Sequence, residues 1–223
     1  MPSASKRRAA ERAARKRQLR TIGAAVAVVI VLGGVAVLST SLGGDDAVDG
    51  GSQTQPVEVE GVALPVFPEQ GEDPAVGTVA PTLVGRDFGG DRVEVGPGGS
   101  DGVAQAIWFV AHWCPHCQAE VPVIVELART GSIPEGMSVL TVSTSVDAAA
   151  PNYPPSAWLE REGWPYPVLA DDERGTAAHA YGVAGFPFLV VLDADGTVLA
   201  RTSGELGADG IVTLLERAVT TAR

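Results

Sequence analysis

The chain contains two cysteines, Cys114 and Cys117, and both lie in the stretch IWFVAHWCPHCQAEVP (107–122). A mostly apolar run of β-compatible residues, 103–111, ends just before the first of them. Such a run is typical of a strand that is covered on both faces. The residues that follow have the pattern of a helix, so the sequence places Cys114 where a buried strand gives way to a helix.

This position favours Cys114 as the more reactive thiol. The unpaired N–H groups and the dipole at the start of a helix stabilise an anion. Pro115 fits the first helical turn, because its missing N–H is not needed there. Cys117 follows three residues later, on the same face of the helix and more shielded. The spacing therefore allows attack by Cys114 and resolution by Cys117.

Other roles for the pair have less support in the sequence. A structural disulfide between residues this close would remove little entropy from the unfolded chain. Structural zinc requires four ligands, and only His112, His116 and His179 are available to join the thiols. A copper site is harder to dismiss, and a redox-inactive peptide-binding domain is a further alternative. We interpret the pair as a redox centre and expect no bound metal and no other cofactor.

The N-terminal part of the chain predicts a membrane anchor. Residues 1–20 carry eight basic side chains and one acidic residue, and residues 21–42 carry no charge. As a helix, the second segment would span about 33 Å, enough for a hydrocarbon core. The positive-inside rule then places the basic tail in the cytoplasm and the rest of the chain outside the cell membrane, as a single-pass protein. A cleaved signal peptide is the alternative, although its apolar region would be shorter.

Charge and composition divide the remainder of the chain. After residue 20 there are 8 basic and 26 acidic residues, which argues against nucleic acid as a partner. Residues 43–75 are acidic and rich in glycine and proline, so we expect an extended linker. Within this linker, residues 62–68 are a candidate for docking on the domain. The folded domain is expected over residues 76–223.

The pattern of this domain predicts an α/β fold with a mixed central sheet flanked by helices. Strands are expected at 91–96, 103–111, 137–146, 186–193 and 197–204, and helices at 117–130, 154–163, 174–183 and 207–222. A strand–helix–strand unit followed by a hairpin and a closing helix indicates a sheet with both parallel and antiparallel pairs.

These features resemble the thioredoxin superfamily, in particular its membrane-anchored extracytoplasmic branch, the TlpA/ResA-like thiol-disulfide oxidoreductases. The motifs that carry the resemblance are WCPHC (113–117), CxxCxxExP (114–122), GFP (185–187) and LDADGTV (192–198). The resemblance implies a thioredoxin-like fold, with Cys114 and Cys117 as a redox-active disulfide. It implies that Cys114 is the nucleophile and Cys117 the resolving thiol. It also implies that Pro187 is a cis-proline that helps to bind the substrate, with Phe186 facing the same site.

Three further residues are candidates for the site. Glu120 matches a glutamate that ResA-like proteins keep near the active site, where a partly buried carboxylate can exchange a proton with Cys117; a solvated surface acid is the alternative. The dipeptide before Cys117 resembles that of DsbA-type oxidants. Its His116 can stabilise a Cys114 thiolate, which would make the disulfide more oxidising. Trp113, beside the nucleophile, is expected to face the substrate.

The sequence thus predicts an extracytoplasmic, membrane-anchored thiol-disulfide oxidoreductase. Its expected clients are exported cysteine-containing proteins, whose thiols it would oxidise or isomerise, and a membrane redox partner would reset the pair. One alternative is the reduction of haem-attachment thiols in apocytochromes. Another is a non-enzymatic, copper-handling domain of the same fold.

We predict that the mature protein retains its N-terminus, because the apolar segment 21–42 is long and is not followed by a good cleavage site. Mass spectrometry of the membrane fraction should therefore recover peptides from residues 1–20. Recovery of a soluble form that begins near Gly43 would show a cleaved signal peptide instead.

Overall fold

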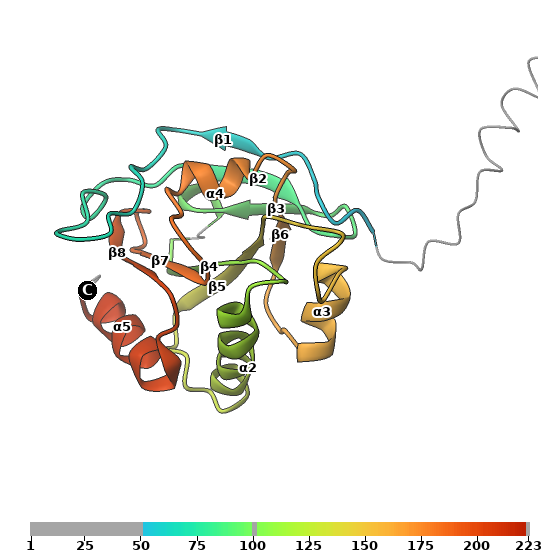
Figure 1. The fold of residues 1–223 in the computed structure, drawn as a ribbon. Coiled ribbons are helices and arrows are strands. Elements are labelled where there is room, and N and C mark those ends of the chain that lie inside the picture. The colour runs from blue at the N-terminus through green and yellow to red at the C-terminus, as the bar shows by residue number, and fades with distance from the viewer. Residues whose placement is uncertain (1–50, 100–101, 222–223) are drawn as a thin grey trace, which may run out of the picture. The chain divides into compact units, whose positions relative to one another are not determined.

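The computed structural model describes residues 51–99 and 102–221 (Figure 1). The expected basic tail, membrane helix and first part of the linker, residues 1–50, lie outside this range. Within the part that is described, no helix is both long and apolar enough to cross a membrane.

A five-stranded sheet forms the centre of the domain, with the strand order β6-β5-β4-β7-β8. Strand β4 (Ala104–Val110) is parallel to β5 (Met137–Ser143) and antiparallel to β7 (Phe188–Leu192). The edges are β6 (Val168–Ala170) and β8 (Val198–Ser203). This mixed sheet confirms the expected α/β architecture.

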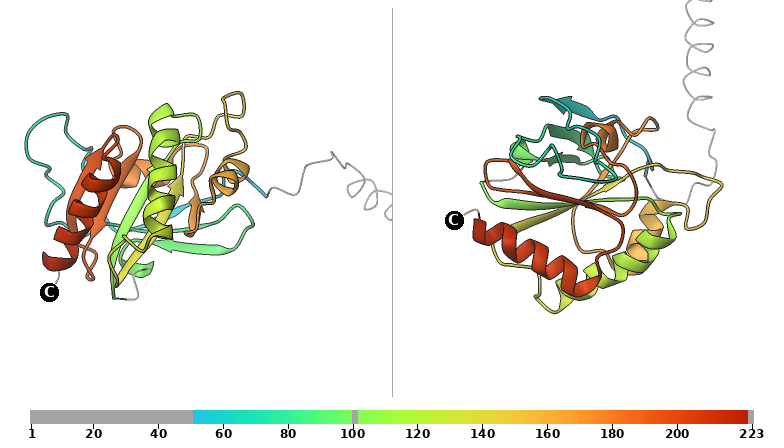
Figure 2. Two further views of the ribbon diagram at one scale, coloured as in Figure 1. Left: turned by 90° about the horizontal axis from the view of Figure 1, so that it is seen from below. Right: turned by 60° about the vertical axis from the view of Figure 1, so that its left-hand side comes forward.

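Helices cover one face of the five-stranded sheet. Helices α2 (Pro115–Arg129) and α5 (Gly207–Thr221) pack there side by side, and α3 (Pro155–Glu162) lies next to α2 (Figures 1 and 2). The N-terminal end of α2 follows the carboxyl end of β4, the central strand of the sheet. A helix and a sheet strand therefore meet at the position of the two cysteines.

The opposite face is covered by a second, antiparallel sheet and the short helix α4 (Thr176–Ala180) (Figure 1). The second sheet has the order β1-β2-β3 and consists of β1 (Glu58–Glu60), β2 (Thr82–Arg86) and β3 (Arg92–Val95). A single turn of 3-10 helix, Pro97–Gly99, follows β3.

Both faces of β4 are buried, each in its own apolar core. Ala106, Trp108 and Val110 pack with α2 and α5, whereas Ile107 and Phe109 pack with the second sheet and α4. Successive side chains of a strand point to opposite faces, so a strand with two covered faces is mostly apolar; the polar side chain of β4, Gln105, is buried and accepts a hydrogen bond from the Gly96 N–H at 3.0 Å. This explains why the run before the cysteines has no polar alternation.

All the expected strands and helices are present, but three strands were not predicted. Strands β1 and β6 have three residues each, and β2 contains Gly85. Such short or interrupted runs give little periodicity to detect in a sequence.

The structure also differs from the expected linker, because residues 51–75 pack on the domain. The Leu64 N–H donates to the Ala180 carbonyl at 2.8 Å, and the Phe67 N–H donates to the Gly182 carbonyl at 2.9 Å. Leu64 and Ala75 are buried, and β1 pairs with β2. The docking suggested for residues 62–68 is confirmed, and residues 51–75 are part of the folded domain instead of an extended linker.

A buried ion pair holds this N-terminal segment in place. Arg201, on edge strand β8, donates from Nε and Nη2 to the carboxylate of Asp73, at 2.9 and 2.5 Å. Its Nη1 donates to the carbonyls of Pro65 and Tyr181, and its guanidinium lies 5.6 Å from the ring centre of Phe67. The hydrogen bonds from Arg201 lower the pKa of Asp73. One arginine thus connects three parts of the segment to the sheet.

We predict that Asp73→Ala lowers the free energy of unfolding by about 3 kcal/mol at pH 7, because it leaves the buried Arg201 without a counter-charge. Urea denaturation measures the change. Since Asp73 has a lowered pKa, the difference from wild type should shrink as the pH falls through that pKa. Glu126→Ala, which breaks an exposed ion pair with Arg129, should have a far smaller effect. Equal effects of the two substitutions would contradict the proposed clamp.

Candidate active site

Cys114 lies at the junction between β4 and α2. It is the N-cap residue of α2, and Pro115 occupies the first helical turn. The Cys114 N–H donates to the Ala111 carbonyl at 3.0 Å, which forms the turn out of the strand. No side chain caps the helix, so the N–H groups of the first turn are left to stabilise a thiolate at Cys114.

The two cysteines are free thiols in different surroundings. Cys114 is 6% exposed, and its Sγ donates to the Phe186 carbonyl at 3.5 Å. Cys117 is 0% exposed and lies in the apolar core beneath α2. Burial raises the pKa of Cys117, an effect that the Ala111 N–H, 3.5 Å from its Sγ, offsets only in part. Cys117 therefore stays protonated at neutral pH, which leaves Cys114 as the attacking thiol.

The residues expected to bind substrate lie together beside Cys114. The peptide bond between Phe186 and Pro187 is cis, as the resemblance implied, and it directly precedes β7. The Trp113 ring meets the Phe186 ring edge to face, with centroids 6.2 Å apart. Trp113 is partly exposed, and its Nε1 donates to the Ser145 carbonyl at 2.7 Å. An aromatic surface thus borders the nucleophile.

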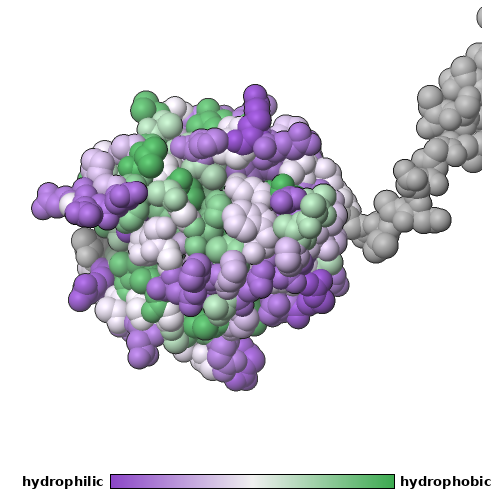
Figure 3. Space-filling model, viewed as in Figure 1, coloured by the Kyte–Doolittle hydropathy of each residue, from purple (hydrophilic) through white to green (hydrophobic). Residues whose placement is uncertain are grey.

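A hollow of about 230 Å³ adjoins this surface. Its lining consists of Ser145, Glu173, Arg174, Gly175, Ala178, His179, Val183, Ala184, Gly185 and Phe186. His179, on α4, therefore lies at the edge of the site. In Figure 3, apolar and weakly polar surface crosses the middle of the visible face, between hydrophilic flanks.

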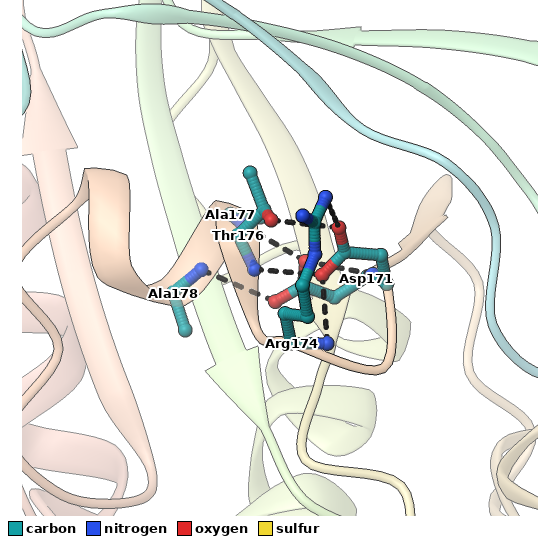
Figure 4. A network of polar contacts seen from close by, with 6 residues as sticks. Asp171, Arg174, Thr176, Ala177 and Ala178 are labelled. Atoms are coloured by element: carbon teal, nitrogen blue, oxygen red, sulfur yellow. Dashed lines mark hydrogen bonds and ion pairs between the residues drawn. The ribbon is translucent and has the colours of Figure 1, made fainter.

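The α4 wall of the hollow is held in place by Asp171. This buried carboxylate accepts hydrogen bonds from the N–H groups of Ala177 and Ala178, at 2.8 and 3.2 Å, at the start of α4 (Figure 4). It also accepts a hydrogen bond from the Thr144 hydroxyl at 2.6 Å. The loop and the short helix beside the site are therefore fixed to the end of β5.

Glu120 is buried below the helix surface, at 3% exposed. Its Oε1 accepts a hydrogen bond from the Leu206 N–H at 2.6 Å. Burial raises its pKa, and the N–H groups of Leu206 and Gly207 partly offset this rise. Glu120 is also close enough to Cys117 for its charge to raise the pKa of that thiol. The alternative interpretation of Glu120 as a solvated surface acid is wrong.

His116 contacts a residue that the sequence did not indicate. Its Nδ1 lies 2.5 Å from Oε1 of Glu205, in the loop between β8 and α5, and the two side chains are 67% and 42% exposed. Glu205 is 89 residues further along the chain and belongs to none of the motifs. Only the tertiary structure brings it to the site.

His112 is buried and has a structural role. Its Nε2 accepts a hydrogen bond from the Asp147 N–H at 3.2 Å, so Nδ1 carries the proton that it shares with the Pro151 carbonyl at 2.8 Å. This arrangement requires an uncharged ring. Across residues 51–99 and 102–221, no three His, Cys, Asp or Glu side chains are grouped as metal ligands would be.

Comparison with known proteins agrees with this geometry. The Redoxin family model matches residues 75–215. The chain is 31% identical over 144 residues to a thiol:disulfide interchange protein, the DsbE homologue of Paracoccus denitrificans, a match that covers 65% of this chain and 71% of that protein. It is 31% identical over 113 residues to thiol:disulfide interchange protein CycY of Rhizobium leguminosarum bv. viciae, a match that covers 49% of this chain and 56% of that protein.

A solved structure shares the fold. The crystal structure of a thiol:disulfide interchange protein of the thioredoxin family from Chlorobium tepidum superposes with a TM-score of 0.53 at 22% identity. The superposition covers 64% of this chain and 97% of that structure. The likeness establishes the thioredoxin-like arrangement of the central sheet and its helices.

We predict that Glu120→Gln changes how stability depends on pH. Between about 4.3, the ordinary pKa of glutamate, and the raised pKa of Glu120, the folded domain binds more protons than the unfolded chain. Its free energy of unfolding therefore falls as the pH rises through this window. Glutamine cannot ionise, so the free energy of unfolding of the variant should rise relative to that of wild type between pH 4.5 and 7. The expected rise is about 1.4 kcal/mol for each unit by which folding raises the pKa of Glu120. If urea denaturation gives the same difference in unfolding free energy between the variant and wild type at pH 4.5 and at pH 7, the raised pKa of Glu120 is contradicted.

Proposed function

Since the chain belongs to the Redoxin family and is a thiol-disulfide oxidoreductase, we propose that it exchanges disulfides with exported cysteine-containing proteins through Cys114 and Cys117. The observation that carries this proposal is the division between the two thiols. Cys114 is at the helix N-terminus beside the Phe186 carbonyl, and Cys117 is buried one turn below it with a raised pKa. One thiol meets the client, and the other resolves the intermediate.

In the oxidising direction, a client thiolate attacks Cys114 of the Cys114–Cys117 disulfide. The bond between the two cysteines breaks, a mixed disulfide forms, and Cys117 leaves as a thiolate. A second client thiolate then attacks the client sulfur of the mixed disulfide, which releases an oxidised client and the Cys114 thiolate. The helix N-terminus stabilises that thiolate as a leaving group. Reduction of a client follows the same steps in reverse.

Glu120 is placed to handle the proton of Cys117. A thiolate at Cys117 is unfavourable because the site is buried, so it takes up a proton as it forms. Burial raises the pKa of Glu120, which favours its protonated form, and in that form it can pass a proton to Cys117. In the reverse step, the Glu120 carboxylate accepts the proton again.

Oxidation or isomerisation is the direction that the Pro115–His116 dipeptide favours. Reduction of client disulfides, such as those of haem-attachment thiols in apocytochromes, is the second candidate, and the pairing of His116 with Glu205 supports it. The reduction potential of the cysteine pair separates the two. A value near that of protein disulfide isomerase, about −180 mV, supports the first direction, and a value near that of thioredoxin, about −270 mV, supports the second.

The uncharged segment 21–42 supports a position outside the cell membrane for the catalytic domain, with residues 1–20 in the cytoplasm. In that compartment exported proteins acquire and lose disulfides. A membrane redox partner would restore the oxidised or reduced state of the pair after each cycle.

We predict that Cys117→Ala accumulates mixed disulfides, because no thiol remains to resolve the bond between Cys114 and a client. The reduced variant is incubated with two peptide strands joined by a disulfide. Cys114 should bind one strand and release the other, so non-reducing mass spectrometry should show the added mass of one strand. Cys114→Ala should gain none, since the buried Cys117 does not reach the peptide. Equal trapping by the two variants would contradict the assigned order of attack.

A further inference from the structure

Three consecutive residues of the loop between β8 and α5 each contact a different part of the active site. The Gly204 N–H donates to the Pro187 carbonyl at 2.8 Å, and the Leu206 N–H donates to Glu120 at 2.6 Å. Glu205 lies between them, with its carboxylate 2.5 Å from Nδ1 of His116. Because its neighbours are fixed on both sides, Glu205 is held against the first turn of α2.

We propose that Glu205 is a positioning residue that keeps His116 from the Cys114 thiolate, so that the Cys114–Cys117 disulfide is less oxidising than the Pro115–His116 dipeptide would otherwise make it. This inference rests on the proposed function, in which Cys114 is the attacking thiolate. Through His116, a residue outside the motifs would thus influence the redox balance of the pair.

The effect of His116 on the Cys114 thiolate depends on where the proton and the charge of the imidazole are directed. A histidine between the cysteines stabilises the thiolate when its N–H or its positive charge is directed to the sulfur. In the structure Nδ1 of the ring faces the Glu205 carboxylate, which accepts the Nδ1–H and offsets a positive charge on the ring. A less stabilised thiolate makes the reduced protein less favourable, and hence the disulfide a weaker oxidant.

A second route from Glu205 to the thiols must be separated from this one. The charge of Glu205 contributes to the raised pKa of Glu120, which in turn lies close to Cys117. A change at Glu205 could act through Glu120 without any part played by His116. The two routes can be distinguished, because the route through His116 is lost when the imidazole is removed and the route through Glu120 is not.

The test is a cycle of variants equilibrated with glutathione. Oxidation of the protein forms the Cys114–Cys117 bond while one glutathione disulfide is reduced to two glutathione thiols, so the ratio of the two protein forms gives the equilibrium constant. The variants are Glu205→Gln, which removes the charge, Glu205→Ala, which also removes the acceptor, His116→Ala, and His116→Ala combined with Glu205→Gln. Glu126→Gln, which removes the same charge from the exposed far end of α2, is the matched control.

We expect Glu205→Gln to favour the reduced protein about two- to fivefold, the range for an exposed ion pair, which corresponds to about 10 to 20 mV. Glu205→Ala should have an equal or larger effect. Alkylation of Cys114 by iodoacetamide at pH 6 should become faster in both variants, since more of the thiol is ionised. In the His116→Ala background the change on adding Glu205→Gln should vanish, and Glu126→Gln should match wild type.

Three results would overturn the inference. One is an equilibrium constant of Glu205→Gln that equals that of wild type, which would mean that the carboxylate does not keep His116 from the thiolate. A constant shifted toward the oxidised protein would likewise overturn it, because it would mean that the carboxylate strengthens the effect of His116. The third is a shift of the same size in the His116→Ala background, which would show that the effect does not pass through His116. A wild-type protein that forms no Cys114–Cys117 disulfide with glutathione would instead contradict the proposed function itself.

Discussion

The position of the active site depends on the complete burial of β4. Its alternate side chains fill two separate apolar cores, so the strand is fixed in the middle of the sheet. Strand β7 runs antiparallel to it, with Phe109 opposite Phe188. This register places the start of β7 beside the end of β4. Cys114 and Phe186, 72 residues apart in the chain, meet because the two strands run in opposite directions.

The same arrangement separates the chemistry of the two thiols. The helix begins after the carboxyl end of β4, where Pro115 and His116 are exposed in its first turn, and continues over the apolar core that surrounds Cys117. The difference between the two thiols therefore follows from their places on α2, because Cys114 is the N-cap residue and Cys117 is a fully buried residue of the helix. Glu120, one turn further, accepts hydrogen bonds from the N–H groups of Leu206 and Gly207 at the start of α5, which partly offset the effect of its burial.

The sequence predicted the parts of the site that depend on local pattern. A buried strand, a helix start and a pair of cysteines with a fixed spacing can be recognised without tertiary contacts. The residues that were missed act over long separations. Glu205 reaches His116 across 89 residues, and Asp73 reaches Arg201 across 128 residues. Composition alone made residues 51–75 look like a linker, because their acidic and glycine-rich character outweighs the few apolar residues that dock.

The docking of this segment also defines the smallest unit that can fold well. A fragment starting at residue 76 would lack β1, so one side of β2 would lose its hydrogen-bonded neighbour. An open strand edge of this kind is a template for pairing with other chains and promotes aggregation. The fragment would also leave the guanidinium of Arg201 in a cavity that Pro65, Phe67 and Asp73 no longer close. The first 25 described residues are thus as much a part of the domain as the strands that carry the cysteines.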